Sequence, residues 1–477
     1  MSDRERAAKA IVLGSTLITF MWLSINSSIT GRVLGVVLLA LVLWSLYPKH
    51  LLASSILIIA LLSLFEASLN TDAFVSSLFV SYGRSGLWIV VSGFILAEAM
   101  RVSGLGRRIA LWIVVSLGGN MKSILLSVAV ASLAVAPLSP STTAKAFLIL
   151  PICNGLIEAF GEEKGSSKFG AGVMLMAMAA NNICSTGFLT GTVPNPIAAF
   201  QIHHVTGIDL NWSNWFWMGF PLTILLLFCS WWICRWMFKS EVKNPEEPLR
   251  RIMDLRREAG PLKRSEIIVA ILFATALLLW ITEPLLGLNV GIVSVLLALV
   301  VFLPRIGVLK MGGFAGAVPW GPIAIFAAST FLANAIGRWR ALDPVALIIF
   351  NGLDFAQIPH PFFVSLTVLV SMLLHVGFTS TTVYATIMIP LTIALAQIHE
   401  LQPQLVAIPL AFLAPVSLIL PINTIPNIIF YSSGWFTQRQ IIKYGLLTSL
   451  ISVLLVLTVG MLYWQYLGLI DLNMGWY

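Results

Sequence analysis

The stretch "PSTTAKAFLILP", residues 140–151, places three hydroxyl side chains and a lysine between two prolines in an otherwise apolar region. A near-copy, "TSTTVYATIMIP", occupies residues 379–390. In each copy an alanine follows the serine by five residues and a proline follows it by ten. Proline and small polar residues interrupt apolar helices, so each copy predicts a broken or re-entrant segment.

The composition around these stretches is that of a membrane protein. Hydrophobic residues make up 58% of the chain and charged residues 10%, and the mean hydropathy is +0.94. Soluble domains carry about a quarter charged residues. Apolar runs recur along the chain and predict about ten to twelve crossings of the lipid bilayer. We therefore expect an all-α polytopic protein of the plasma membrane.

The polar stretch 239–266 carries eight basic and six acidic residues. Because Lys and Arg accumulate in cytoplasmic loops, we expect this loop and the basic N-terminus in the cytoplasm and the C-terminus outside. The net charge of +8 has the same explanation and does not indicate nucleic-acid binding. No small-residue cleavage motif follows the first apolar stretch, which predicts a membrane helix rather than a signal peptide.

Two further pairs of motifs repeat in the same order. "LAEA" at 96–99 matches "LANA" at 332–335, and "TVPNPI" at 192–197 matches "TIPNII" at 424–429. The offsets of the three pairs are 239, 236 and 232 residues. A near-constant offset predicts two repeats of about half the chain each.

The predicted organisation has three parts. Residues 1–238 form a first repeat with a hairpin tip near 141–143, residues 239–266 a cytoplasmic linker, and residues 267–477 a second repeat with a tip near 380–382. Transporters are often built from inverted repeats that bind substrate at the membrane midplane, between broken helices. The sequence therefore favours a transporter.

The residues at the breaks suit an anion and a small cation. Hydroxyls and free N–H groups at a half-helix start bind oxyanions, so two tips can face a dianion from opposite sides. Neutral side-chain oxygens and broken-helix carbonyls suit Na⁺. The predicted substrate-binding residues are Ser141, Thr142, Thr143, Ser380, Thr381, Thr382 and Lys145.

Other interpretations remain open at this stage. A single Ser-Thr-Thr can simply pack helices together. Lys145 lies on the same helix face as the hydroxyls and either supplies a fixed charge for the anion, snorkels to the interface, or pairs with Glu98 or Glu158. An anion channel or a proton or arsenite antiporter is the competing class. An enzyme is not expected, since no H-E-x-x-H, G-x-S-x-G or paired intramembrane carboxylates occur.

At these motifs the sequence resembles the divalent anion/sodium symporter family, which carries di- and tricarboxylates or sulfate. "GTVPN" at 191–195 and "NTIPN" at 423–427 are similar to one motif pair of the family, "GFILAEAMRVSGLGRRIAL" at 93–111 to a motif of its first half, and "IPNIIFYSSGWFT" at 425–437 to its C-terminal stretch. The resemblance implies about eleven transmembrane helices plus two re-entrant hairpins, with scaffold and transport domains, elevator-type movement and a homodimer. It covers nearly the whole chain.

The resemblance also implies two sodium sites and no organic cofactor. Their expected residues are Ser141, Gly191, Thr192, Asn195, Ser380, Asn423, Thr424, Pro426 and Asn427. The chain departs from the family where an asparagine in each tip is replaced by Thr142 and Thr381. We therefore expect sodium-coupled symport of a dicarboxylate such as succinate or malate, or of citrate. The alternatives are sodium-independent exchange, with the Lys145 ammonium replacing a cation, or sulfate transport.

Overall fold

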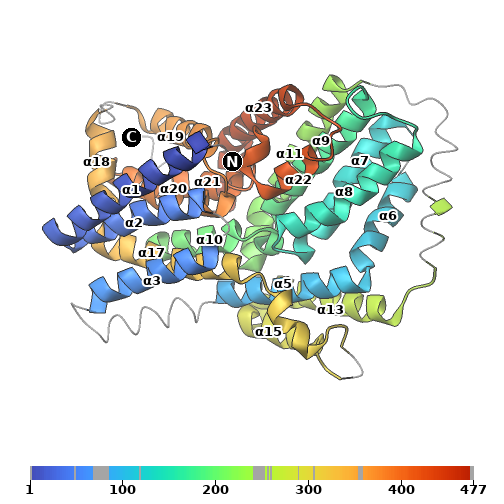
Figure 1. Ribbon diagram of the computed structural model, residues 1–477, viewed down its shortest axis with the longest axis horizontal. Coiled ribbons are helices and arrows are strands. Elements are labelled where there is room, and N and C mark those ends of the chain that lie inside the picture. The colour runs from blue at the N-terminus through green and yellow to red at the C-terminus, as the bar shows by residue number, and fades with distance from the viewer. Residues whose placement is uncertain are drawn as a thin grey trace.

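The computed structural model describes residues 3–47, 50–67, 85–117, 120–239, 253–254, 257, 260–287, 289–304, 307–352 and 358–472. The described residues form helices and no strand, which confirms the predicted all-α class (Figure 1). Seven of these helices are long and apolar enough to cross a membrane, and six shorter apolar helices accompany them. The number of eleven crossings stays a prediction. Most of the predicted linker 239–266 lies outside the described residues.

The helices before the linker are α1 (Asp3–Asn26), α2 (Ile29–Leu46), α3 (Leu51–Ala67), α5 (Ser85–Ser103), α6 (Leu105–Leu117), α7 (Met121–Val135), α8 (Thr142–Ala159), α9 (Lys168–Ile183), α10 (Pro194–Thr206) and α11 (Trp212–Met237). The helices after it are α13 (Arg264–Ile281), α14 (Glu283–Leu286), α15 (Val290–Val300), α16 (Phe314–Ala317), α17 (Trp320–Trp339), α18 (Asp343–Gly352), α19 (His360–His375), α20 (Thr381–Ile398), α21 (Gln404–Leu413), α22 (Ile425–Tyr431), α23 (Gln438–Leu455) and α24 (Met461–Tyr466). A π-helical turn, Val456–Gly460, joins the last two.

The elements follow the same order in both halves. In the first half α5 and α6 precede the pair α7–α8, then the pair α9–α10, then the long helix α11. In the second half α17 and α18 precede α19–α20, then α21–α22, then α23. Figure 1 shows α7 and α8 toward one end of the molecule and α19 and α20 toward the other, with α10, α11, α21 and α22 between them.

The pairs α7–α8 and α19–α20 are joined by short tips. Pro137 starts the first tip in a 3₁₀ turn, and Ser141 ends it by capping α8, its Oγ accepting a hydrogen bond from the N–H of Ala144 at 3.1 Å. Ser380 caps α20 in the same way through the N–H of Val383 at 3.4 Å. Hydroxyl residues are favoured at this position because they satisfy free N–H groups of the first turn.

The pairs α9–α10 and α21–α22 are helices interrupted by extended and 3₁₀ backbone. A long helix crosses each break through a glycine. A Cβ on Gly219 of α11 would lie 2.9 Å from the carbonyl oxygen of Thr186, and one on Gly445 of α23 would lie 2.2 Å from that of Leu418. Only glycine permits such close approach of a helix to another backbone.

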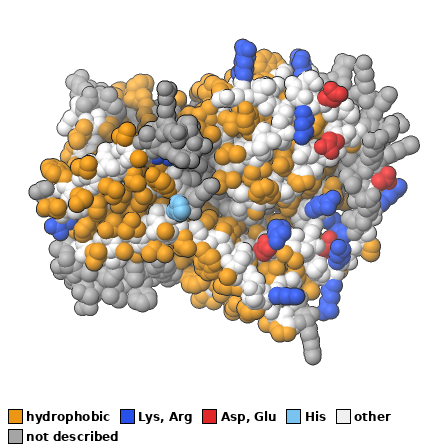
Figure 2. Space-filling view, viewed as in Figure 1, with side chains coloured by type: hydrophobic (Ala, Val, Ile, Leu, Met, Phe, Trp, Pro, Cys, Tyr) orange, Lys and Arg blue, Asp and Glu red, His pale blue; other side chains and the backbone are white. Residues whose placement is uncertain are grey.

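A second apolar core lies apart from the main one. It joins buried side chains of α5, α13 and α15, including Phe94, Leu272 and Ala298. Figure 1 shows these three helices along one edge of the molecule. Figure 2 shows charged side chains gathered toward one end, where α6 and the start of α13 lie in Figure 1, while the other end is mainly apolar.

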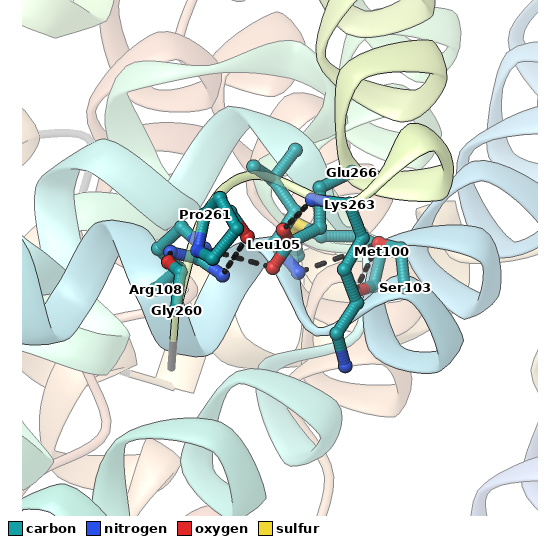
Figure 3. A network of polar contacts seen from close by, with 8 residues as sticks. All are labelled: Met100, Ser103, Leu105, Arg108, Gly260, Pro261, Lys263 and Glu266. Carbon is teal, nitrogen blue, oxygen red and sulfur yellow. Dashed lines mark hydrogen bonds and ion pairs between the residues drawn. The ribbon is translucent and has the colours of Figure 1, made fainter. Parts of the chain in front are cut away.

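A polar network attaches the end of the linker to α6 (Figure 3). The Nε of Arg108 donates to Glu266 at 2.9 Å, and its other nitrogens donate to the carbonyl oxygens of Gly260 at 2.7 Å and Pro261 at 3.2 Å. Glu266 also accepts from the backbone N–H of Lys263 at 2.7 Å and is only 3% exposed. The network therefore fixes the start of α13 against the first half.

Removing the Glu266 carboxylate should destabilise the protein. Glu266→Ala leaves Arg108 without its buried counter-charge, and we expect a loss of about 2–3 kcal/mol, somewhat below the range for fully buried pairs because Arg108 is partly exposed. Thermal unfolding in detergent measures the effect. Arg257→Ala, which breaks the exposed pair with Asp254, is the control and should change stability by less than about 1 kcal/mol. Equal effects of the two variants would contradict the anchoring role.

Candidate functional site

The two hairpin tips present half-buried hydroxyls beside free backbone donors. Residues 141–143 and 380–382 are all partly exposed, and most of α20 behind the second tip is buried. The first-turn N–H groups of α8 and α20 that Ser141 and Ser380 do not cap have no partner within their helices. Both tips can therefore donate hydrogen bonds to an anion, and substrate binding at these residues stays a prediction. No hydrogen bond joins the two tips in the part of the chain that the structure describes.

Lys145 points into the protein and not toward lipid or water. It is 2% exposed, and its Nζ lies 2.6 Å from the carbonyl oxygen of Gly191 and 2.8 Å from the Oγ of Ser185. A third acceptor, the carbonyl oxygen of Ala136, lies at 3.5 Å. The Ser185 hydroxyl donates its own proton to the carbonyl of Asn181 at 2.7 Å. Lys145 must therefore be the donor in all three contacts, which uses the three protons of an ammonium.

These contacts exclude two of the interpretations of Lys145. It does not snorkel, because its charged end is buried, and its polar partners are a hydroxyl and carbonyls rather than Glu98 or Glu158. Glu98 instead pairs with Arg101, one turn along α5, at 2.5 Å. The fixed positive charge thus lies at the first break.

The predicted cation residues Asn195 and Asn427 act here through their N–H₂ groups. Asn195 Nδ2 donates to the carbonyls of Ser185 at 2.7 Å and Phe188 at 2.8 Å. Asn427 Nδ2 donates to those of Ser417 at 2.8 Å and Leu420 at 3.1 Å. In both cases the acceptors lie ten and seven residues before the asparagine, so one arrangement braces both breaks.

The amide oxygens of these two asparagines differ. Asn427 Oδ1 accepts from Nδ2 of Asn182 at 3.0 Å, across the two halves. Asn195 Oδ1 is buried and has no hydrogen-bond partner among the described residues. The residue 232 positions after Asn182 is Ala414, so the second half has no matching amide to reach back to Asn195.

The remaining predicted cation residues surround the breaks. The carbonyl of Gly191 binds Lys145, and a Cβ at Gly191 would lie 2.4 Å from the carbonyl oxygen of Ser185. Asn423 ties the second break to its tip by donating to the carbonyls of Val376 at 2.9 Å and Phe378 at 3.2 Å. Thr192 is buried beside the first break. Thr424 caps α22, whose first turn contains Pro426, a position that requires no N–H.

In the second half Tyr384 stands at the position of Lys145. Its ring stacks on the buried His375 with the ring centres 3.9 Å apart, and its hydroxyl lies 4.0 Å from the sulfur of Met372. No cationic side chain therefore reaches the second break among the described residues. The two halves share their backbone scaffold but differ in charge.

A cavity of about 680 Å³ leads to the first tip. It lies between α5–α6 and α8, and Ser141 and Lys145 line it together with Glu98, Arg101 and Arg107. None of the residues 380–382 lines this cavity. A cavity of about 270 Å³ lies between α10 of the first half and α17, α18 and α20 of the second, and it is lined by Pro390, Arg340 and Asp343 among others.

Sequence reasoning missed Ser185, Asn182 and the Ala136 carbonyl. A signal for Ser185 exists, since it precedes Asn195 by ten residues just as Ser417 precedes Asn427. Thr190 was also missed; its hydroxyl donates to the carbonyl of Pro137 at 3.0 Å and holds the first tip. No clusters of three or more His, Cys, Asp or Glu side chains suited to a metal occur among the described residues.

Substitutions of Asn195 test whether it stabilises the first break through its N–H₂ group or binds a cation through its Oδ1. Asn195→Asp removes both donated hydrogen bonds and should destabilise the protein by about 2–3 kcal/mol, as much as Asn195→Ala, because it leaves buried carbonyls unpaired. Thermal unfolding with and without Na⁺ measures this. An aspartate variant of wild-type stability that gains further stability from Na⁺ would show instead that Asn195 binds a cation through Oδ1.

Comparison with known proteins finds several relatives among membrane proteins and transporters. The chain is similar to a membrane protein of Cupriavidus necator, at 25% identity over 92% of this chain and 88% of the relative. It is 28% identical to a sodium-dependent dicarboxylate transporter of Staphylococcus aureus over 89% of this chain and 85% of that one. It is 25% identical to a citrate/succinate antiporter of Escherichia coli over 80% of this chain and 78% of that one.

The fold is also found among solved structures. The YdaH transporter of Alcanivorax borkumensis, described as having an unusual topology, superposes with a TM-score of 0.53 at 14% identity, over 84% of this chain and 90% of that one. Residues 10–470 match the family described as the sodium:sulfate symporter transmembrane region. The chain therefore belongs to this family of divalent anion/sodium symporters and is a multi-pass membrane transport protein, not an enzyme.

Proposed function

We propose that this protein exchanges small dicarboxylates, such as succinate or malate, or citrate, across the plasma membrane without requiring sodium. The observation that carries the proposal is the Lys145 ammonium, which binds the Gly191 carbonyl and the Ser185 hydroxyl at the first break. The resemblance implies a sodium site at this break. A tethered ammonium there offsets one negative charge of the substrate in every transport cycle.

Three further features support exchange over the symport that the sequence alone favoured. Thr142 and Thr381 replace amides that would bind a cation and an anion at once. Neutral acceptors bind the three protons of the Lys145 ammonium but leave its net charge uncompensated, and such a charge costs about 3 kcal/mol in the membrane, so the empty carrier should cross poorly. The similar Escherichia coli protein is a citrate/succinate antiporter.

Sodium-coupled symport through the second half is the second candidate. The hydroxyls of Ser380 and Thr424 and the backbone around Asn423 have no cationic side chain beside them in the described part of the chain. Hard neutral oxygens of this kind suit Na⁺, and the similar Staphylococcus aureus protein is sodium-dependent. In this candidate mechanism fewer Na⁺ ions accompany each substrate than a pair of symmetric sodium sites would bind.

The wider mechanism follows from the two halves. We take residues 1–238 and 267–477 as inverted repeats, with the linker 239–266 in the cytoplasm and the C-terminus outside. The hairpins, the broken helices and the long helices α11 and α23 would then form a transport domain that moves as an elevator against a scaffold of the other helices. A homodimer would hold the scaffold in place.

Replacing Lys145 should change the mode of transport. In proteoliposomes preloaded with unlabelled succinate, the wild-type protein should take up labelled succinate equally in Na⁺ and in K⁺. Lys145→Ala removes the fixed charge and should lower this exchange by about tenfold or more, or make it depend on Na⁺. Lys122→Ala, an exposed lysine on α7, is the control. Wild-type uptake that requires an inward Na⁺ gradient and no internal anion would establish symport instead.

The tip serines should matter for the substrate more than for stability. Ser141→Ala and Ser380→Ala each lose a helix cap, worth about 1 kcal/mol, and a donor to the anion. Ser167→Ala is the matched control because Ser167 caps α9, its Oγ accepting a hydrogen bond from the N–H of Gly170 at 2.7 Å. Ser167 follows the end of α8 that is farthest from the tip, so its loss should not affect the substrate. Only the tip variants should raise the KM for succinate severalfold. Equal KM values in all three variants would refute the assignment of the tips.

A further inference from the structure

The cavity that reaches Lys145 has a second group of charges away from the tip. α8 runs away from the tip, from Thr142 to Ala159, and the cavity follows it as far as Leu156. Arg101 and Arg107, at the end of α5 and the start of α6, line the cavity beside the middle of α8, where a Cβ on Gly106 would lie 2.5 Å from Leu148. We call this part of the cavity its mouth. This mouth lies on the side of the molecule to which the linker is attached, because Arg108 binds Gly260 and Pro261.

The two arginines at this mouth differ in their partners. Arg101 holds Glu98 with both ends of its guanidinium, Nε to Oε2 at 2.7 Å and Nη2 to Oε1 at 2.5 Å. Arg107 is exposed and has no hydrogen bond or ion pair among the described residues. In the wall of the cavity Arg101 therefore already binds the Glu98 carboxylate bidentately. Arg107 lines the same cavity, and its N–H donors are unused among the described residues.

The polar network of Figure 3 determines where Arg107 points. Arg108 is held toward the linker by Glu266 and two carbonyl oxygens. Successive residues of an α-helix point about 100° apart. With Arg108 fixed on the linker face of α6, Arg107 lies on a neighbouring face, and its side chain lines the cavity.

The matching place in the second half carries the opposite charge. The residue 236 positions after Arg107 is Asp343. It pairs with Arg340 at 2.5 Å, so these two charges in the smaller cavity compensate each other. The linker-side cavity, in contrast, is lined by three basic side chains and one acidic side chain. The two ends of the protein thus differ in their attraction for an anion.

We propose that Arg107 is a capture site for the dianionic substrate at the linker-side mouth, from which the anion moves along the cavity to Ser141 and Lys145. This inference rests on the proposed function. Arg107 binds one carboxylate of a small dicarboxylate and raises its local concentration, so the linker side has the lower KM. Because the mouth is exposed, the attraction is modest and is screened by salt.

A charge-reporter experiment tests the mouth without any transport. Ala144→Cys places a thiol in the same cavity, in a Cys229→Ser background that removes the half-buried native thiol. The rates of its modification by an anionic and by a cationic methanethiosulfonate reagent are compared. Arg107→Gln should lower the anionic-to-cationic ratio by about two- to fivefold, the size of an exposed ion pair, and Arg107→Glu should lower it further. Lys168→Gln, an exposed lysine that does not line the cavity, should leave it unchanged.

Transport from each side supplies the second readout. Labelled succinate uptake is measured in inside-out and right-side-out membrane vesicles carrying the full-length protein. Arg107→Gln should raise KM about two- to fivefold on the linker side only, with an unchanged maximal rate, and should flatten the dependence of this KM on salt.

The possible results distinguish a failure of the Arg107 capture site from a failure of the proposed dicarboxylate exchange. An unchanged reagent ratio, or a KM that shifts equally on both sides, would overturn the capture site. A lower maximal rate with an unchanged KM would assign Arg107 a structural role and would also overturn it. A wild-type protein that transports neither succinate nor citrate would contradict the proposed function, while the reagent ratio would still decide whether Arg107 attracts anions.

Discussion

The structure depends on one buried charge and its three acceptors. An ammonium in a membrane segment is stable only when its protons are bound, and Lys145 meets this need through Ser185 and the carbonyls of Gly191 and Ala136. Two of these acceptors, the Ser185 hydroxyl and the Gly191 carbonyl, lie in the break between α9 and α10, and the third, the Ala136 carbonyl, lies in the first hairpin tip. The break in turn is held open by Asn195 and tied to the tip through Thr190. The charge, the break and the hairpin tip therefore form one unit.

The same scaffold without the charge occurs in the second half. Asn427 braces its break with the spacing that Asn195 uses, and Asn423 ties the break to the tip. Tyr384, stacked on His375, stands in place of the lysine. A carrier with one charged and one neutral half can balance a dianion with fewer mobile cations than two neutral halves. The cavities follow the same asymmetry: basic side chains predominate among the charged groups of the larger one, whereas Arg340 and Asp343 pair in the smaller one.

Much of this could be predicted from the sequence, because periodic features survive in a single chain. Apolar runs gave the helical class, and matched spacing of Ser-Thr-Thr and proline located both capped tips at Ser141 and Ser380. The direction of Lys145 could not be predicted, because its partner Ser185 lies forty residues away on another helix and only the fold brings them together. For the same reason the sequence does not reveal that the N–H₂ groups of Asn195 and Asn427 face backbone carbonyls, and the role of these asparagines in cation binding stays a prediction. The Asn182–Asn427 contact crosses the two halves and has no counterpart that a repeat would reveal.

The most direct test of the Lys145 assignment is the affinity of the purified protein for succinate as a function of Na⁺ concentration. Ions that bind together with the substrate raise its affinity by linkage, whereas the Lys145 side chain is part of the protein and needs no Na⁺ from solution. If Lys145 replaces the cation, the Kd for succinate is the same in Na⁺ and in K⁺. A Kd that falls with Na⁺ with a logarithmic slope of about two would mean that two sodium ions bind with the substrate, and it would contradict the assignment.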